Sequence, residues 1–258
     1  MKAVLLAGGL GSRISEETHI KPKPMIEIGN KPVIWHIIKN LSQFGFKHFI
    51  ICCGYKGEYI KDYFLNYIYN QHDIRIDLSK KNTLVLDRSK KENWKIDLIN
   101  TGDDSGTGGR LKYLKKYLKK NEYFLMTYGD GLTNLNVKKL LEFHKKNLGK
   151  SIITAVQPSG RFGSLNIKKN NIVSNFKEKP KGDGNWVNGG YFILNCKNLE
   201  LIENFYSAWE DKPLKILSKN NKLLAFKHNG FWKAMDTLSD KKFLEDLWNK
   251  NKAPWKNW

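Results

Sequence analysis

The sequence predicts an α/β fold, in which a Rossmann-like, mainly parallel central sheet is flanked by helices and carries a small antiparallel excursion. Continuous apolar runs at 3–7 and 49–53 are typical of strands that are covered on both faces. Between these runs, apolar residues recur at helical spacing, at Val33, Ile34, Ile37, Ile38 and Leu41. Gly45 then marks the end of the helix. Two β-α units in succession imply a parallel sheet.

The remaining elements follow in order along the chain. A second helix is expected over 58–67, and short alternating runs between 70 and 101 predict the antiparallel excursion. Further helices are expected at 106–120, 137–147, 198–206, 213–219 and 239–249. Further strands are expected at 123–128, 151–156, 163–167, 172–177, 189–194 and 223–227, with a hairpin turn at 169–171.

Length and composition favour one domain over 1–258. An apolar fraction of 40% in 258 residues is ample for a packed core and excludes a disordered chain. The apolar runs are far shorter than the roughly 20 residues that span a bilayer. The run after Met1 stops at glycines, which favours a strand over a signal peptide. The three cysteines are odd in number and lack metal-ligand spacing, so we expect a reducing, cytoplasmic location.

The formal net charge of +20 is the feature that could indicate a nucleic-acid or membrane partner. Only five of the 45 cations are arginine, however, and bidentate recognition of bases and phosphates favours arginine. Lysines scattered along the chain are more typical of a solvated surface. We therefore expect no specific nucleic acid and no membrane as partner, while nucleic-acid binding remains the alternative.

A glycine-rich loop directly after the first strand is the strongest local motif. It comprises Leu6, Ala7, Gly8, Gly9, Leu10, Gly11, Ser12 and Arg13. Glycines let the backbone approach a ligand closely, and successive N–H groups there can cradle a triphosphate. A dinucleotide-binding loop is disfavoured because Arg13 stands where a glycine and a helix start are required. A simple turn would explain the glycines but not the arginine.

Lys23 stands between two prolines, which predict an extended segment that presents its ammonium group with little ordering cost. Together with Arg13, it could neutralise the charge that develops when a triphosphate is attacked. These two residues are the candidate catalytic residues. The alternative is that both are ordinary surface cations.

Two aspartates are candidate metal ligands. Asp130 lies between glycines at the end of a buried strand, where α/β sheets bind ligands. Asp236 follows an apolar stretch that would hold it inside. Mg²⁺ on a phosphate typically takes one or two carboxylates and completes its shell with water and phosphate oxygens. Each aspartate alone could equally be a turn residue or a helix cap.

Two further segments carry polar groups beside glycines. Glu178 and Lys179, followed by Asn188, would suit the hydroxyl and phosphate groups of a sugar phosphate. Ser105 and Arg110 flank a glycine-rich turn at the start of a helix, which offers N–H groups, a hydroxyl and a guanidinium group.

The order of these motifs resembles the sugar-1-phosphate nucleotidylyltransferases. The motifs are Gly-Gly-x-Gly-Ser-Arg, Pro-Lys-Pro, Gly-Asp-Gly, Glu-Lys-Pro and Asn-Gly-Gly. Several stretches are closest to members that use CTP and glucose 1-phosphate, at 15–18, 21–27, 31–36, 50–57, 107–112 and 252–256. The likeness covers essentially the whole chain.

This resemblance implies that CTP and α-D-glucose 1-phosphate give CDP-glucose and pyrophosphate, with Mg²⁺. It implies a nucleotide-binding half at about 1–135, a sugar-phosphate-binding half at about 136–240, and a helix end and tail at 241–258. By matching motifs, residues 6–13, Lys23, Ser105 and Arg110 would bind the nucleotide. Asp130 and Asp236 would hold Mg²⁺, and Gly163, Glu178, Lys179 and Asn188 would bind the sugar phosphate.

The resemblance also implies a homo-oligomer, with the Trp255 and Trp258 tail as a candidate subunit contact, and a place in lipopolysaccharide O-antigen biosynthesis. The sequence departs from the family pattern at two places, of which the first preserves a hydroxyl group and the second concerns recognition of the base. Ser12 replaces the more usual threonine, and Ser105-Gly106 stands where threonine and a bulkier residue are expected. A related activity with UTP or dTTP therefore remains open, as does a non-catalytic nucleotide- or RNA-binding role.

Overall fold

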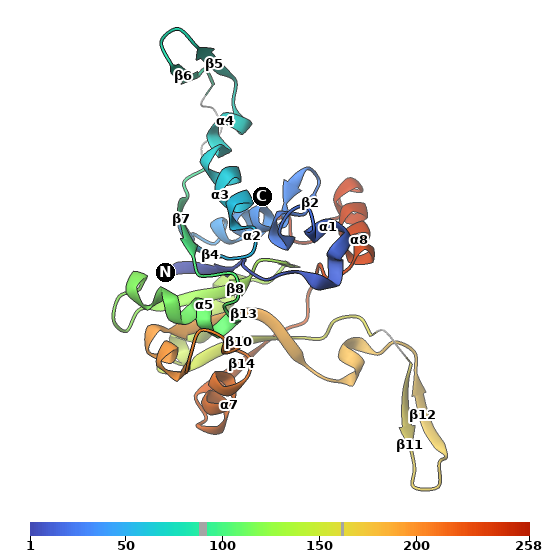
Figure 1. Cartoon of the computed structure of the whole chain (residues 1–258). Coiled ribbons are helices and arrows are strands. Elements are labelled where there is room, and N and C mark those ends of the chain that lie inside the picture. Colours follow the sequence, from blue (N-terminus) through green and yellow to red (C-terminus); the bar gives the residue numbers. More distant parts are fainter. Residues whose placement is uncertain (88–91, 161–162) are drawn as a thin grey trace.

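The computed structural model describes residues 1–87, 92–160 and 163–258, apart from the side chains of residues 13, 15, 16 and 183. Among these residues, the centre is a seven-stranded sheet in the order β14-β10-β13-β8-β1-β4-β7 (Figure 1). The strands are β1 (Lys2–Leu6), β4 (His48–Cys53), β7 (Lys95–Asn100), β8 (Tyr123–Tyr128), β10 (Ser151–Val156), β13 (Val187–Asn195) and β14 (Leu223–His228). Only β13 runs antiparallel to its neighbours in this described sheet. The prediction of a mainly parallel α/β sheet is confirmed.

Helices cover both faces of the sheet. The α-helices are α1 (Ser15–Thr18), α2 (Val33–Ser42), α3 (Gly57–Leu65), α4 (Tyr67–Gln71), α5 (Thr107–Tyr113), α6 (Val137–Lys146), α7 (Lys212–Lys219) and α8 (Leu238–Asn249). Short 3₁₀ helices are η1 (Ser12–Ile14), η2 (Lys23–Met25), η3 (Leu114–Tyr117), η4 (Lys181–Gly184) and η5 (Cys196–Leu201).

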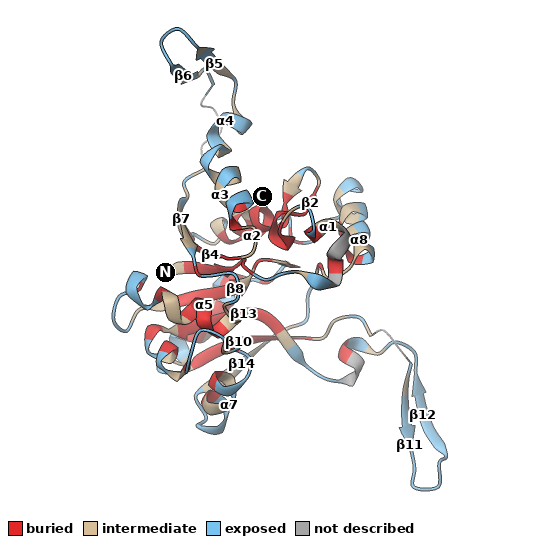
Figure 2. Ribbon diagram, in the orientation of Figure 1, coloured by how far each residue is buried: buried red, intermediate tan, exposed pale blue. Residues whose placement is uncertain are grey.

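Successive residues of β1 enter two separate cores, as the continuous apolar run predicts. Ala3 and Leu5 pack with apolar residues of α2, α6 and α8 on one face. Val4 and Leu6 pack with α5, η5 and α7 on the other. Because each face of a parallel sheet is buried by helices, the strand needs no polar positions. Figure 2 shows this buried centre in red.

Two sequence-based boundaries were wrong. The run at 95–100 belongs to β7, which pairs parallel to β4 in the main sheet, so the excursion contains only β5 (Ile74–Asp77) and β6 (Asn82–Val85). β7 is an edge strand and is only half-buried, which gives it the alternating pattern of an antiparallel strand. The helix expected over 198–206 is the shorter η5, and a loop over 202–211 follows it.

Two antiparallel hairpins project from the body of the molecule (Figure 1). One is β5–β6, and the other is β11 (Ser164–Ile167) with β12 (Val173–Lys177), where Asn171 takes the left-handed conformation (φ 63°) in the predicted turn. Both carry exposed apolar side chains, among them Leu78, Leu84, Ile167 and Phe176. Neither hairpin is covered by the rest of the described chain (Figure 2).

The tail folds back onto its own chain. Trp255 is fully buried, and its carbonyl accepts a hydrogen bond of 2.8 Å from the Nδ2 atom of Asn40 in α2. Trp258 packs edge-to-face on Trp35 at 5.7 Å between ring centroids. The expectation that Trp255 contacts another subunit is therefore wrong, because its side chain belongs to the core of this chain.

In the described part of the chain, no helix has the length and apolarity to cross a membrane.

Candidate active site

The glycine-rich loop after β1 lines a cavity of about 410 Å³. We name it the nucleotide cavity after its predicted ligand. The residues predicted from the sequence that line it are Leu6, Ala7, Gly8, Gly9, Gly11, Ser12, Lys23, Ser105, Arg110 and Asp130. Leu10 has an exposed side chain and does not line the cavity. The side chain of Arg13 lies outside the described residues. Gly11 needs its glycine, since its φ is +67° and a Cβ atom would meet Thr18 at 2.8 Å.

Lys23 is buried beside this loop, at the start of η2. Pro22 is extended as predicted, but Lys23 itself turns into the 3₁₀ helix, because the N–H of Met25 bonds to the carbonyl of Pro22 at 2.8 Å. Its Nζ atom donates to Oδ2 of Asp130 and Oδ1 of Asp236, each at 2.6 Å. The structure thus brings one predicted catalytic residue and both predicted metal ligands together.

A short antiparallel pair explains why the two aspartates meet. β9 (Gly131–Thr133) follows Asp130 directly, and it pairs with β15 (Trp232–Ala234), which ends just before Asp236. The N–H of Met235 donates to the carbonyl of Asp130 at 2.9 Å. Pairing the strands therefore places both carboxylates at one point beyond the carboxyl end of β8, the position where α/β sheets bind ligands.

The donor set suits Mg²⁺ when phosphate completes it. Two carboxylates converge on one cation, the ammonium of Lys23, and their side chains are 27% and 17% exposed. Within the described ranges, no cluster of three or more His, Cys, Asp or Glu side chains could hold a metal ion. An ion here would need substrate oxygens and water, which is the usual arrangement for Mg²⁺ on phosphates.

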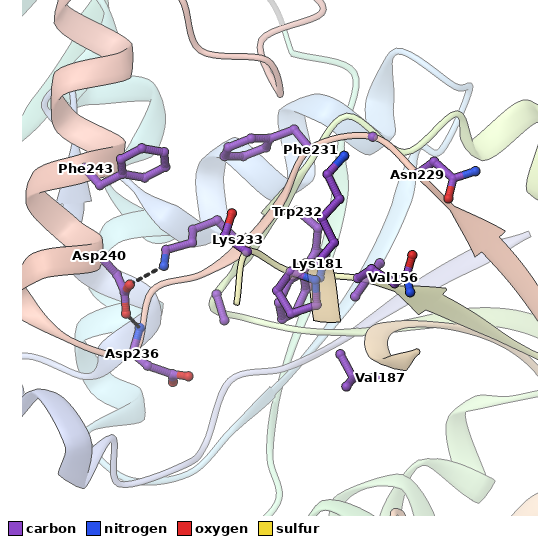
Figure 3. Close-up of a pocket in the computed structure, with 15 residues that line it drawn as sticks. Val156, Lys181, Val187, Asn229, Phe231, Trp232, Lys233, Asp236, Asp240 and Phe243 are labelled. Atoms are coloured by element: carbon purple, nitrogen blue, oxygen red, sulfur yellow. Dashed lines mark hydrogen bonds and ion pairs between the residues drawn. The ribbon is translucent and has the colours of Figure 1, made fainter. Parts of the chain in front are cut away.

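Asp240 is a positioning residue that the sequence analysis missed. Its carboxylate accepts hydrogen bonds from the N–H groups of Asp236 and Thr237, at 3.1 and 2.9 Å, within the capping box of α8. Burial opposes its ionisation, but the Lys233 and Thr237 side chains hold the pKa of Asp240 below its ordinary value. Figure 3 shows Asp236 and Asp240 beside a larger cavity of about 560 Å³. The Nζ atom of Lys233 lies 2.5 Å from Oδ1 of Asp240.

Arg110 supports the nucleotide loop from behind. Its guanidinium group donates to the carbonyls of Gly8, Gly102 and Asp103 at 2.8, 2.7 and 3.1 Å and to the hydroxyl of Thr101 at 2.9 Å. A Cβ atom on Gly8 would lie 2.2 Å from this group, so Gly8 must be a glycine for the arginine to fit. Arg110 thus fixes the loop while forming part of the cavity wall.

The turn before α5 differs from expectation. The N–H groups that the sequence analysis expected to face a ligand are bonded within the chain. Gly106 donates to the carbonyl of Phe205, and Gly108 and Gly109 donate to that of Ser207, at 2.8 to 3.2 Å. Ser105 lines the nucleotide cavity, while its hydroxyl donates to the Thr101 carbonyl at 2.5 Å.

The predicted sugar-phosphate residues are divided between two places. Asn188 lines a cavity of about 300 Å³ that also contains Asp130 and Asp236. Glu178 and Lys179 form an exposed ion pair of 3.5 Å at the base of the β11–β12 hairpin and do not line this sugar-side cavity. Gly163 lies beside them, since a Cβ atom there would be 3.3 Å from Oε2 of Glu178.

Among the other residues that line the two cavities, several with polar side-chain groups had not been assigned to the site from the sequence. Thr107 borders the nucleotide cavity, Glu210 and Trp232 border the sugar-side cavity, and Tyr128 borders both. Tyr128 could have been noted, because it comes two residues before Asp130. Glu210 lies in the loop over 202–211, where neither periodicity nor a motif marks it.

The fold and this site define a class of phosphate-transferring enzyme that has a glycine-rich loop, one lysine and two aspartates at the end of an α/β sheet. The model of the nucleotidyl transferase family matches residues 2–240, and the chain belongs to that family. The predicted family membership is confirmed.

Particular relatives narrow the class. The chain is 52% identical to glucose-1-phosphate cytidylyltransferase of Salmonella typhimurium over 100% of both chains. It is 31% identical to mannose-1-phosphate guanyltransferase of Saccharomyces cerevisiae, over 95% of this chain and 63% of that one. The crystal structure of HddC from Yersinia pseudotuberculosis complexed with GMP-PN is similar, with a TM-score of 0.69, 25% identity, and coverage of 96% and 99%.

Proposed function

We propose that this chain transfers the cytidylyl group from CTP to α-D-glucose 1-phosphate, giving CDP-glucose and pyrophosphate. The observation that carries the proposal is the meeting of Lys23 with Asp130 and Asp236 at the nucleotide cavity. Identity of 52% over the full length to an enzyme with that name supports CTP and glucose 1-phosphate as the substrate pair.

The reaction forms one phosphorus–oxygen bond and breaks another. A phosphate oxygen of glucose 1-phosphate attacks the α-phosphorus of CTP, and the bond to pyrophosphate breaks. Because the attacking oxygen is already anionic, no side chain has to remove its proton. Catalysis then depends on alignment and on neutralising negative charge.

Lys23 supplies the buried positive charge in this proposal, at the α-phosphate. The loop over 6–13 wraps the nucleotide and its phosphates, and Arg13 acts with Lys23 as the second catalytic cation. Ser105 and Arg110 complete the nucleotide side. Support comes from the cavity that the loop, Ser105 and Arg110 line together.

Mg²⁺ is the proposed cofactor, held by Asp130 and Asp236 together with substrate phosphates. When bound, it supplies charge neutralisation on the phosphate oxygens. Supporting this role, both carboxylates already enclose a cation, the Lys23 ammonium group. Lys23, which also lines the nucleotide cavity, would add a second positive charge beside the phosphates.

The sugar-phosphate half comprises Asn188, which lines the sugar-side cavity, with Gly163, Glu178 and Lys179 at the base of the hairpin. We place the nucleotide-binding half at about 1–135 and this half at about 136–240, within one domain. Lys179 would bind the sugar phosphate group, and Glu178 and Asn188 its hydroxyls.

We further propose that the chain forms a homo-oligomer in the cytoplasm. The exposed apolar side chains of the two projecting hairpins support the oligomer, which light scattering after size-exclusion chromatography tests. The three cysteines are free and buried, as suits a reducing compartment.

The deciding experiment measures pyrophosphate release with Mg²⁺, glucose 1-phosphate and each of CTP, UTP, dTTP, ATP and GTP in turn. We expect turnover to be fastest with CTP. Faster turnover with UTP or dTTP would assign the chain to a related activity, and no product with CTP would refute the proposal. Titration with a random oligonucleotide at physiological ionic strength tests the RNA-binding alternative, for which we expect no binding.

A further inference from the structure

The loop over 202–211 is fastened to the nucleotide side of the site. Its carbonyls accept three hydrogen bonds from the glycines that begin α5, and the N–H of Trp209 donates to Oγ1 of Thr107 at 2.9 Å. A Cβ atom on Gly109 would lie 1.8 Å from the carbonyl oxygen of Phe205. Gly106, Gly108 and Gly109 at the start of α5 therefore allow close backbone packing with this loop, which holds Glu210 at the site.

Glu210 links the two sides of the site through its carboxylate. One oxygen accepts the hydroxyl proton of Thr107 at 2.5 Å, and the other accepts the hydroxyl proton of Tyr128. Thr107 lines the nucleotide cavity, and Tyr128 forms the wall between that cavity and the sugar-side cavity.

Tyr128 has little freedom to move. Its ring packs edge-to-face on Phe192 at 6.3 Å, and a Cβ atom on Gly190 would meet the ring at 2.8 Å. Its hydroxyl oxygen is 3.4 Å from the Nδ2 atom of Asn188, which donates toward it.

A hydroxyl group has one proton to donate. Since Tyr128 gives that proton to Glu210, its oxygen can only accept further hydrogen bonds, from Nδ2 of Asn188 and from a ligand in the sugar-side cavity. The amide of Asn188 is held by its own Oδ1 atom, which accepts from the N–H of Gly190 at 2.8 Å. An oxygen that only accepts is matched by a donor on the ligand, such as a sugar hydroxyl group.

We propose that Glu210 is a positioning residue that fixes Tyr128 as a hydrogen-bond acceptor for one hydroxyl group of the sugar phosphate. This inference deepens the proposed function and rests on it. Glu210 acts through Tyr128 and makes no contact with the reacting phosphates in this account. The same carboxylate is held in place by the hydroxyl group of Thr107, which lines the nucleotide cavity.

The test compares Glu210→Gln with the unaltered enzyme in steady-state kinetics with Mg²⁺. Glutamine keeps the shape, but its amide can donate to Tyr128 and release the tyrosine proton toward the cavity. We expect the KM for glucose 1-phosphate to rise about tenfold, the scale of one hydrogen bond, while the KM for CTP changes less than about twofold. Glu203→Gln, on the same loop and paired with Lys212 at the surface, is the matched control and should leave both constants unchanged.

A double-mutant cycle separates positioning from general damage. In the Tyr128→Phe background, Glu210→Gln should have no further effect on the KM for glucose 1-phosphate. The KM is also measured for the four monodeoxyfluoro analogues of glucose 1-phosphate. In the unaltered enzyme, the KM should be raised for the one analogue that lacks the hydroxyl group donating to Tyr128. In Glu210→Gln, that difference between analogues should be smaller.

Three outcomes would overturn the inference. They are additive effects in the cycle, equal changes in both KM values, or a lower KM for glucose 1-phosphate, which would indicate simple charge repulsion by Glu210. Absence of turnover by the unaltered enzyme with CTP would instead refute the proposed function, so the two failures are distinguishable.

Discussion

The Lys23 cluster and the Glu178–Lys179 pair are both assigned to the site, but they differ in how far the fold prepares them. The Lys23 side chain is 8% exposed and contacts two carboxylates at 2.6 Å, whereas the Lys179 side chain is 62% exposed and lies 3.5 Å from one. An exposed pair contributes little to stability, while a buried charge must be paired to remain. The Lys23 side of the site is therefore preformed, whereas the Glu178–Lys179 pair remains exposed to solvent.

Asp130→Asn changes the preformed side of the site and should have the largest effect on turnover. It removes one of two charges that hold Lys23 and the proposed Mg²⁺, so kcat should fall by at least about a hundredfold. Pyrophosphate release at saturating CTP and glucose 1-phosphate measures this. Asp211→Asn is the control, since that carboxylate forms an exposed ion pair with Lys215 of α7 and its loss should leave kcat unchanged. Near-normal turnover in Asp130→Asn would remove Asp130 from its proposed role.

Lys179→Ala tests the exposed side and should have a smaller, selective effect. Because Lys179 is exposed, its loss should leave the melting temperature unchanged while the KM for glucose 1-phosphate rises about tenfold. Lys168→Ala, another exposed lysine of the same hairpin region, should change neither quantity. If Lys179→Ala matched Lys168→Ala in kinetics, the contrast between the two sides would lose its functional meaning.

Substitution of His36 should have the smallest effect on catalysis at neutral pH. Unlike Lys23, this buried side chain is uncharged at neutral pH. Burial lowers the pKa of His36 to about 4, against about 6.5 in the unfolded chain. The unfolded state therefore binds more protons between these values, and stability is lost as the pH falls from about 6.5 toward 4, by about 3 kcal/mol for this group. Above pH 7 it has no effect.

Urea unfolding at several pH values measures this dependence. In His36→Gln, the fall in stability between pH 6.5 and 4 should be shallower than in the unaltered chain, although its stability at pH 7 is lower. An equally steep fall would show that His36 is not the titrating group. Burial also lowers the pKa of His144, which acts in the same direction in both proteins.

Local patterns predicted most of the fold because they act over a few residues. The continuous run at 3–7 predicted β1, and apolar spacing from Val33 to Leu41 predicted α2. β7 was misplaced because an edge strand alternates whatever its pairing. The helix expected over 198–206 was too long because the segment after η5 pairs with the start of α5, where the Phe205 carbonyl accepts from Gly106 and the Ser207 carbonyl from Gly108 and Gly109. Such long-range pairing leaves no periodic signal.

The site residues divide in the same way, into those marked by a local pattern and those brought together by long-range contacts. The glycine-rich loop and Asp130 could be found because each comes directly after a buried strand. The convergence of Asp130 with Asp236 depends on the β9–β15 pair, which spacing alone does not reveal. Glu210 could not be found, since its importance lies in two contacts, each to a residue more than eighty positions away in the chain.

The β9–β15 pair also governs when the protein acquires its charge centre during synthesis. Lys23 and Asp236 are 213 residues apart in sequence, so the ribosome must deliver almost the whole chain before they can meet. Closing so long a loop is entropically slow, and the two aspartates have no fixed separation until it closes. A nascent chain can thus complete its first β-α units well before Lys23 meets its second carboxylate.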